Sequence, residues 1–460
     1  MRIDSWDSRA AQKRRQCAAK IPGHWKVPVS ILHDLHEPLQ DNRNNLLELD
    51  IVRRCGIMTE RELRITESFT VKSLLEALAS GELTSLEVTI AYSKRAAIAQ
   101  QLKKVNCLTE TFFAEAEARA RSLDDMRAKG QLAGPLHGLP ISLKDSFQVA
   151  GTQATLGIVS FLDEVSDSNS ALVDILLELG AALYVKTNVP QTLGTVDSEN
   201  NVFGRTLNPW NTMLTPGGSS GGEGALVALQ GSPLGIGTDL GGSVRIPSLC
   251  CGVYGFKPTA SRLPYGGQQS LNAPGTDFML ACAGPISRDL KALEVLVKVV
   301  IDARPALYDS TAIGVPWRDV SKLEKCKLRI GVVPEDPLFP SHPPVRNTMD
   351  EAVRILRSKG MELIYLDPGE CHVADATEVA WKFFGLDETV FSHLKASGEP
   401  AVRSVAFINS LAAALPRKFL PDTSGMDKFR LLATLRHARA AISEDWRKMW
   451  QSNALDVVLC

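Results

Sequence analysis

The sequence predicts an α/β protein with a central mixed, largely parallel β-sheet flanked by helices on both faces. Two observations predict this class. Short apolar runs that suit buried strands, at 139–143 and 182–185, alternate with an amphipathic helical pattern at 170–179. A stretch dense in glycine and serine then follows at 215–259, where backbone groups can approach a ligand closely. Alternating strands and helices are typical of sheets covered on both sides.

The composition indicates a globular protein, and the net charge gives no reason to expect binding to nucleic acid. The 460 residues are 44% hydrophobic and 22% charged, with a net charge of −1. Lys13, Arg14 and Arg15 form the one tight basic cluster, which suits a solvated helix face. No apolar run approaches the length of a membrane span, and the N-terminus lacks the apolar segment of a signal peptide. We therefore expect a cytoplasmic protein without a transmembrane segment.

Cysteine and histidine spacing predicts neither disulfides nor a metal site. The nine cysteines are odd in number and irregularly placed, which favours a reducing compartment. His33 and His36 could lie near each other on a helix, but no third ligand accompanies them.

The N-terminal third predicts helices that support the core. Residues 1–69 are polar and helical in pieces, with a proline-containing break at 21–29. An amphipathic helix at 71–80 ends at Gly81, and the sequence TSLE at 84–87 is a capping box for a longer helix. A third helix is predicted at 111–129, ending at Gly130.

Lys144 stands at the end of the predicted strand 139–143. The carboxyl ends of core strands are where α/β folds hold their sites. A lysine there can also extend its amine to water, and this sequence stretch alone leaves both interpretations open.

Two serine clusters, GGSSGG at 217–222 and DLGGS at 239–243, predict acyl-transfer chemistry. A helix at 223–230 and a strand at 233–237 could fold back so that the clusters meet. Glycines beside Ser243 allow several N–H groups to face one anion, such as the oxygen of a tetrahedral intermediate, and each well-aimed donor contributes roughly 3 to 4 kcal/mol. Ser243 is then the nucleophile, and it needs a base other than histidine.

Other glycine motifs fit less well. The P-loop pattern is absent, and the glycines at 235–241 miss the dinucleotide spacing by one residue. GGSSG at 217–221 fits a nucleophile elbow, but the preceding NPWNTMLTP is a loop rather than the strand that an elbow requires.

Five features in order resemble the amidase signature family: Lys144 after its strand, KTNVP at 186–190, FGRTLNPW at 203–210, GGSSGGEGAL at 217–226 and GTDLGGSVRIPS at 237–248. The sequences of these motifs are most similar to those of the fungal acetamidase and fatty acid amide hydrolase-like branch of the family. The resemblance runs from about residue 74 to 287.

The resemblance implies a Ser-Ser-Lys triad: Ser243 as acylated nucleophile, Ser219 as bridging serine preceded by a cis peptide, and Lys144 as base. It also implies substrate-binding and supporting residues. These are the oxyanion-hole N–H groups of Leu240, Gly241, Gly242 and Ser243, a substrate border at Leu193, and support from Ser220 and an Asp239–Arg245 ion pair. It implies a small-molecule amide substrate and no metal or organic cofactor, and it is compatible with a homodimer. The net charge of −1 predicts no nucleic-acid partner.

Lys144 can accept a proton only when its amine is neutral. Its pKa must then fall from about 10.4 toward roughly 7 to 8, which corresponds to about 4 kcal/mol. Burial can impose a shift of that size.

The resemblance also implies the domain organisation. Residues 1–69 form a mostly helical extension, and 70–460 form a single amidase-signature domain with its catalytic core at about 134–290. Helices at 289–301 and 345–359 and strands at 328–333 and 361–366 follow. Family members continue beyond the apolar strand at 455–460, which we expect to be buried, so the domain is expected to be incomplete at its C-terminus.

Three functions therefore stay open. The leading one is hydrolysis of linear carboxylic acid amides to the acid and ammonia or amine through an acyl-enzyme. The others are an inactive or impaired truncated homologue and an amidotransferase subunit acting on charged tRNA. Trp381, Phe383 and Phe384 suit either an acyl pocket or a packed helix face.

Overall fold

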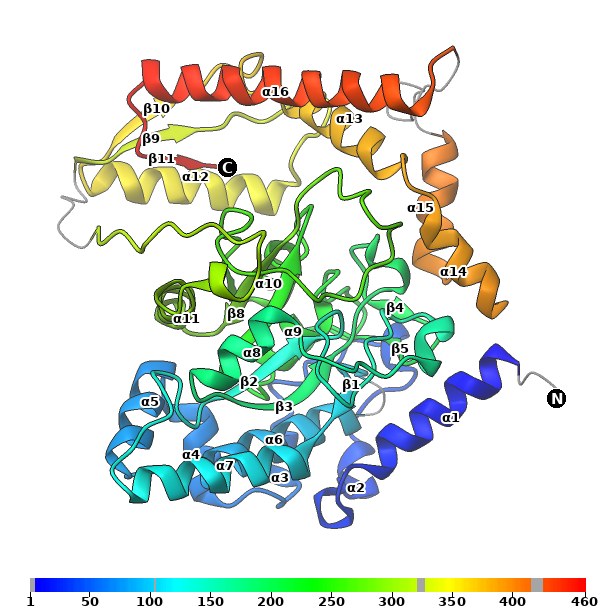
Figure 1. Ribbon diagram of the computed structural model, residues 1–460, viewed down its shortest axis with the longest axis vertical. Helices are drawn as coiled ribbons and strands as arrows, with labels where there is room; N and C mark the ends of the chain where they lie inside the picture. The colour runs from blue at the N-terminus through cyan, green and yellow to red at the C-terminus, as the bar shows by residue number, and fades with distance from the viewer. Residues whose placement is uncertain (1–4, 103–104, 321–326, 415–424) are drawn as a thin grey trace. The chain divides into compact units, whose positions relative to one another are not determined.

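The computed structural model describes residues 5–102, 105–320, 327–414 and 425–460 (Figure 1). The chain forms two compact units. The first comprises Met1–Trp317 and Thr389–Ile408, and the second comprises Arg318–Glu388 and Asn409–Cys460. Because these units divide the chain at other positions, the boundary between 1–69 and 70–460 stays a prediction.

The first unit is built on a six-stranded sheet of order β1-β3-β2-β6-β8-β7. Its strands are β1 (Leu108–Thr111), β2 (Pro140–Lys144), β3 (Ala182–Thr187), β6 (Gly235–Asp239), β7 (Tyr254–Gly255) and β8 (Cys282–Ser287). The three central strands β3, β2 and β6 are parallel, β1 and β8 run against them, and β7 is antiparallel to β8. Four of the six strands thus run in one direction, which confirms a mixed, largely parallel sheet.

Most residues of the central strands are apolar or glycine, which suits strands in the protein interior. Every residue of β2, β3 and β6 is buried, as expected for strands covered by helices on both faces. Lys144 is the last residue of β2, and it is buried with the rest of the strand. A two-stranded sheet, β4 (Glu199–Asn200) and β5 (Gly204–Arg205), lies in the loop before the serine clusters.

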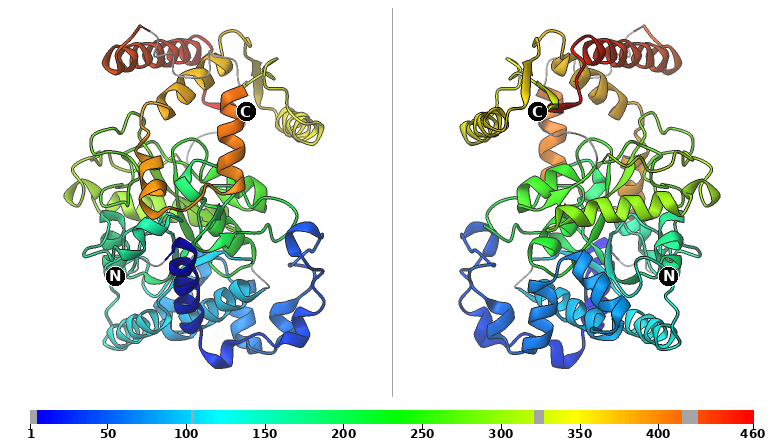
Figure 2. Two further views of the ribbon diagram at one scale, coloured as in Figure 1. Left: turned by 90° about the vertical axis from the view of Figure 1, so that its right-hand side faces the viewer. Right: turned by 90° about the vertical axis from the view of Figure 1, so that its left-hand side faces the viewer.

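Helices cover the sheet, and α4–α7 gather at one end of the first unit (Figures 1 and 2). Helices α6, α7 and α9 pack on β3, and α11 packs on β8 and β7. The α-helices assigned wholly to this unit are α1 (Trp6–Ala19), α2 (Val29–Leu32), α3 (Ile51–Arg54), α4 (Glu60–Ser68), α5 (Val71–Ser80), α6 (Ser85–Gln101), α7 (Phe113–Ala128), α8 (Ala171–Glu178), α9 (Gly221–Ala228), α10 (Arg245–Cys251), α11 (Leu290–Asp302) and α14 (Thr389–Ser397).

Local signals fix several helix ends. Thr84 accepts the N–H of Glu87 in the predicted capping box at the start of α6, and α5 ends at Gly81 with φ of +82°. The predicted start of α7 at Thr111 is wrong, because 108–111 pairs with β3 as β1. Strand β6 lies two residues further along than predicted, since its register is set by antiparallel pairing with β8.

The second unit holds a separate sheet of order β10-β9-β11. Its strands are parallel: β9 (Arg329–Val332), β10 (Glu362–Tyr365) and β11 (Val457–Leu459). Helices α12 (Pro343–Ser358), α13 (Val373–Phe384) and α16 (Lys428–Ser452) belong to it, and α15 (Arg403–Ala414) spans the division at Ile408. The expectation of a buried strand at the chain end is wrong, because β11 is an edge strand whose residues are exposed or half-buried.

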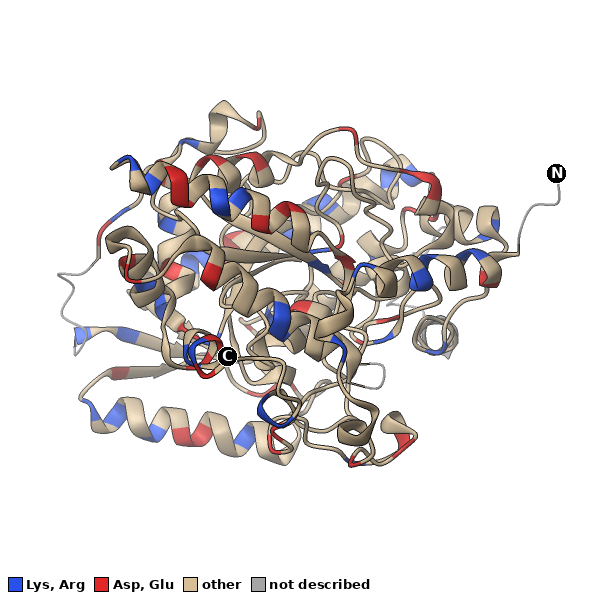
Figure 3. Ribbon diagram, turned by 90° about the horizontal axis from the view of Figure 1, so that it is seen from below, with Lys and Arg blue, Asp and Glu red and all other residues tan. Residues whose placement is uncertain are grey.

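Charges of both signs are interspersed on the helices. Figure 3 shows basic and acidic segments on the same helices, and on α12 Asp350 and Glu351 lie between Arg346 and Arg354. None of the helices in the described ranges is long and apolar enough to span a bilayer.

Candidate active site

Lys144 is the centre of a buried polar cluster. Its side chain has no exposure to solvent, and its Nζ donates to Ser219 Oγ and to Thr238 Oγ1, each at 2.7 Å. A weaker contact reaches the carbonyl oxygen of Thr238 at 3.5 Å. The amine therefore lies within the protein against hydroxyls and a carbonyl, and the interpretation in which it extends to water is excluded.

Burial lowers the pKa of Lys144 to about 7, because an ammonium loses its hydration inside the protein. The carboxylates of Asp239, Glu223 and Asp145 oppose this shift. A substantial fraction of the amine is thus neutral near pH 7, as a base requires.

The first serine cluster leads into α9. The Gly218–Ser219 peptide is cis, and the side chain of Ser219 is buried beside Lys144. The next residue, Ser220, donates its N–H to the carbonyl oxygen of Ser243 at 3.1 Å. The two serine clusters therefore meet, as the sequence predicts.

Ser243 lies in the tight loop between β6 and α10, and it is half-buried, whereas Ser219 is buried. Gly242 has φ of +123°, a conformation that favours glycine, and a Cβ there would lie 2.6 Å from Ile246 Cδ1. The loop thus exposes one serine hydroxyl next to a backbone that only glycine adopts without strain.

Asp239 organises this loop. Its carboxylate accepts the N–H of Gly242 at 2.8 Å and that of Val244 at 3.1 Å, and it forms two bonds of 3.0 Å with the guanidinium of Arg245. These donors, led by Arg245, hold the pKa of Asp239 below its usual value in spite of burial. The predicted pair is therefore present. The Gly242 N–H points at Asp239, so it is engaged within the loop.

Leu193 lies in the short 3-10 turn η4 (Gln191–Leu193) after KTNVP. Thr192 and Leu193 both have positive φ, of 71° and 55°, which is unusual for residues other than glycine. A Cβ on Gly218 would lie 2.5 Å from the carbonyl oxygen of Thr195, so this loop presses against the first serine cluster. Leu193 itself packs on an apolar cluster of Leu156, Ile158, Phe161, Leu271 and Leu394.

Two contributors to the cluster were missed by sequence reasoning. Thr238 provides a hydroxyl to Lys144, and Glu223 is a buried acid in the first turn of α9. Thr238 directly precedes Asp239 at the end of β6, and this position next to a predicted site residue could have identified it from the sequence. Glu223 is one acid among many in the sequence, and only its burial distinguishes it.

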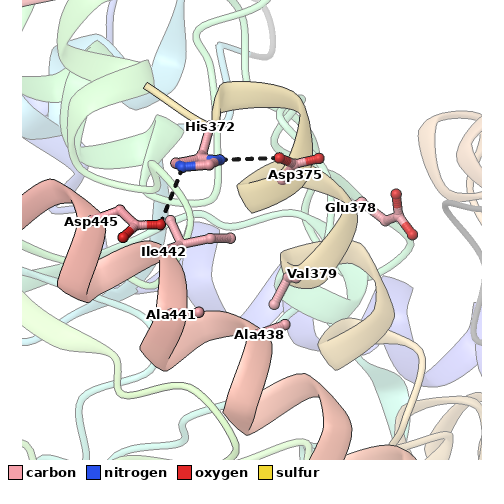
Figure 4. A pocket seen from close by; sticks show the side chains of 8 residues that line it. All are labelled: His372, Asp375, Glu378, Val379, Ala438, Ala441, Ile442 and Asp445. Carbon is pink, nitrogen blue, oxygen red and sulfur yellow. Dashed lines mark hydrogen bonds and ion pairs between the residues drawn. The ribbon is translucent and has the colours of Figure 1, made fainter. Parts of the chain in front are cut away.

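A cavity of about 340 Å³ lies in the second unit, between α13 and α16 (Figure 4). His372 bridges Asp375 at 3.2 Å and Asp445 at 3.5 Å at its edge. None of the predicted site residues lines it.

On α13, Phe383 is buried whereas Trp381 and Phe384 are exposed. Of these three aromatic residues, only Phe383 therefore packs inside the protein. Across the described residues, no group of three or more potential metal ligands was found.

The chain is similar to known amidases. Residues 87–460 match the family model described as Amidase. The chain is 40% identical to an amidase of Gibberella moniliformis over 99% of its own length and 83% of that protein. It is 38% identical to an acetamidase of Emericella nidulans, over 87% of this chain and 72% of that one. A solved fatty acid amide hydrolase is similar with a TM-score of 0.85 at 30% identity, covering 98% of this chain and 76% of that chain.

Proposed function

This chain belongs to the amidase family, and we propose that it hydrolyses linear carboxylic acid amides through a Ser-Ser-Lys triad and an acyl-enzyme. The observation that carries the proposal is the contact of 2.7 Å between Lys144 Nζ and Ser219 Oγ inside a buried cluster. The link from Ser220 to Ser243 supports it, because this link holds the half-buried Ser243 near the buried Lys144 and Ser219.

In the proposed reaction, the neutral Lys144 amine takes the proton of Ser219 as Ser219 takes that of Ser243. The oxygen of Ser243 attacks the amide carbon, and the carbonyl oxygen becomes an oxyanion. Return of the proton along the same path protonates the nitrogen, so the C–N bond breaks and ammonia or an amine leaves. Water then releases the acid from the acyl-serine by the same proton path.

For the oxyanion, we propose the N–H groups of the loop formed by Leu240, Gly241, Gly242 and Ser243. Asp239 and Arg245 support this loop, and Gly242 would have to turn from Asp239 to contribute. The other three N–H groups are therefore the principal donors in the proposal. Leu193 would border the substrate opposite them.

The substrate is proposed to be a short or fatty acyl amide. Acetamidases are among the similar proteins, and a fatty acid amide hydrolase is among the similar structures. A cytoplasmic location and a homodimer stay predictions from the sequence.

The test measures ammonia release from amides of graded acyl length, together with covalent labelling by a fluorophosphonate probe. Wild-type protein should turn over at least one amide and become labelled, and Ser243→Ala should do neither. Labelling of Ser243→Ala at the wild-type rate would place the nucleophile elsewhere. Absence of turnover and labelling in wild-type protein would favour the inactive homologue.

A further inference from the structure

Glu223 is a fully buried acid with no cation in ion-pair contact among the described residues. Its Oε2 lies 2.6 Å from Ser142 Oγ, and Thr187 Oγ1 donates to its Oε1 at 2.8 Å. A Cβ on Gly235 would lie 2.0 Å from Oε2, so the fold leaves room for this carboxyl by placing glycine opposite it. A buried carboxylate is costly unless its charge is compensated.

The nearest functional charge is that of Lys144. Ser142 and Lys144 are two residues apart on β2, so their side chains lie on the same face of the sheet. Ser142 contacts Glu223, and Lys144 contacts Ser219, which is four residues before Glu223 at the start of α9. The carboxyl and the amine are therefore both placed where α9 begins, and each is held by hydroxyl groups.

The other buried charges near the site have their own partners. Asp239 forms an ion pair with Arg245, Asp145 with Lys186, and Glu110 with both Lys13 and Lys20. Among the described residues, Lys144 and Glu223 lack an ion-pair partner of opposite charge, as does Glu399 beside the loop of Leu193. The pair of Lys144 and Glu223 is neutral overall either when both groups are charged or when both are uncharged. Only the uncharged state contains a neutral Lys144 amine, which can accept a proton.

Counting hydroxyl protons favours a protonated Glu223. Ser232 Oγ donates to the carbonyl oxygen of Leu234 at 3.0 Å, and Ser142 Oγ lies 2.8 Å from Ser232 Oγ. Each serine has one hydroxyl proton. When Ser142 donates to Ser232, the proton in its 2.6 Å contact with Glu223 must belong to the carboxyl.

We propose that Glu223 is a positioning residue that holds a proton while Lys144 acts as the base, so that the buried pair stays neutral during catalysis. The inference rests on the proposed function, because it assigns a partner to the proposed base. It gives Glu223, in the GGEGAL segment, a role in controlling the protonation of the proposed base.

The electrostatics of both groups agree with this assignment. Burial raises the pKa of Glu223 to about 7, against the opposing effects of Ser142, Thr187 and Lys144. The pKa of Lys144 falls to about 7 for the same reason. Groups with such close pKa values titrate as a coupled pair.

Other titratable groups around the pair do not replace either member. Tyr184 and Cys107 also face Glu223, and burial raises the pKa of both, that of Cys107 to about 12, so both are neutral. Asp239 and Asp145 act on Lys144, but each already has a cation of its own.

The first test is the pH profile of kcat/KM for Glu223→Gln. Glutamine is neutral, as a protonated glutamate is, so the acid limb of the profile should stay at its wild-type pH. Movement of the acid limb to lower pH, by about one unit for a coupled pair, would overturn the proposal, because it would show that Glu223 carries a negative charge in wild type and favours the ammonium form of Lys144.

A second variant keeps the carboxyl in place. Thr187→Val removes a donor that favours the ionised carboxylate, so if Glu223 already holds its proton, the acid limb should stay at its wild-type pH. The matched control is Thr89→Val, at a buried threonine of α6 whose Oγ1 has no hydrogen-bond partner among the described residues, and its acid limb should match wild type. A Thr187→Val limb at lower pH than that of Thr89→Val would contradict the proposal, because it would reveal a charged carboxylate beside Lys144 in wild type.

Infrared difference spectra between wild type and Glu223→Gln test the proton directly, without turnover. A protonated-carboxyl band that is present in wild type and absent from Glu223→Gln is expected near pH 7, where a substantial fraction of Lys144 is neutral, and its absence from wild type there would overturn the proposal. If Lys144→Met kept normal kinetics, the proposed function would fail whatever this band showed.

Discussion

Nζ of Lys144 lies 2.7 Å from Oγ of Ser219, although 75 positions separate the two residues in the chain. One residue ends β2 and the other precedes α9, so their contact depends on the packing of that helix against the sheet. This packing removes water from an amine that would otherwise be charged, and it gives the amine a hydroxyl as its neighbour. The following predictions depend on these two effects.

The activity of the wild-type enzyme should rise with pH through about 7, because the pKa of Lys144 is lowered to about 7 and only the neutral amine accepts a proton. Lys144→Ala should lower kcat/KM by roughly 10²–10⁴-fold, the usual contribution of a general base. Steady-state kinetics between pH 5 and 9 measure both effects. A variant with wild-type rates would remove the lysine from the mechanism.

Lys144→Met should stabilise the fold while it abolishes activity. Lys144 binds a proton less readily in the folded state than in the unfolded state, so below pH 7 its burial costs on the order of 5 kcal/mol at most. The unfolded chain binds more protons between pH 7 and 10.5, so wild-type stability should rise across that window. The melting temperature of the variant should therefore exceed that of wild type most at pH 6, and the gap should narrow toward pH 10.

Asp239→Asn should damage catalysis more than Arg245→Ala. The carboxylate of Asp239 is buried and accepts the N–H groups of Gly242 and Val244, whereas the Arg245 side chain is 55% exposed. We expect a loss in kcat of about 10²-fold for Asp239→Asn, similar to the loss of an oxyanion donor, and a several-fold loss for Arg245→Ala. Equal losses would mean that the arginine, rather than the backbone contacts, holds the loop.

Glu399→Ala should weaken substrate binding through the loop of Leu193. Glu399 is buried and accepts the N–H of Val159 and the side-chain amides of Gln191 and Asn201. Removing this acceptor should destabilise the protein by roughly 2 kcal/mol and raise KM more than it lowers kcat. Denaturant unfolding and kinetics measure the two effects.

Asp163→Ala is the control for that variant, because this carboxylate is 79% exposed and pairs with Arg9 at the surface. Its effect on stability should stay within about 0.5 kcal/mol. An unchanged KM in Glu399→Ala would show that the loop is positioned without this acid.

Gly235→Ala should destabilise the sheet, since the new Cβ would lie 2.0 Å from the Glu223 carboxyl. Overpacking at a buried strand costs typically 1–3 kcal/mol. Gly314→Ala is the matched control, because no atom of the described residues outside its chain neighbours would lie within 4 Å of a Cβ at that position. Comparable unfolding midpoints for the two variants would contradict the close packing around Glu223.

The sequence by itself determined what depends on neighbouring residues. The capping box at Thr84, the left-handed helix end at Gly81 and the buried strand before Lys144 are local patterns, and the structure confirms them. The two serine clusters are also local. The pKa required of a lysine base follows from chemistry alone.

Tertiary structure decided what depends on residues far apart in the chain. The position of β6 was set by pairing with β8, and the loop of Leu193 is held by Glu399, 208 residues after Gln191. The pKa of Lys144 reflects the loss of water from every side at once, which no local pattern records. For the same reason Glu223 resembles any surface acid in the sequence, and only the fold places it beside the lysine.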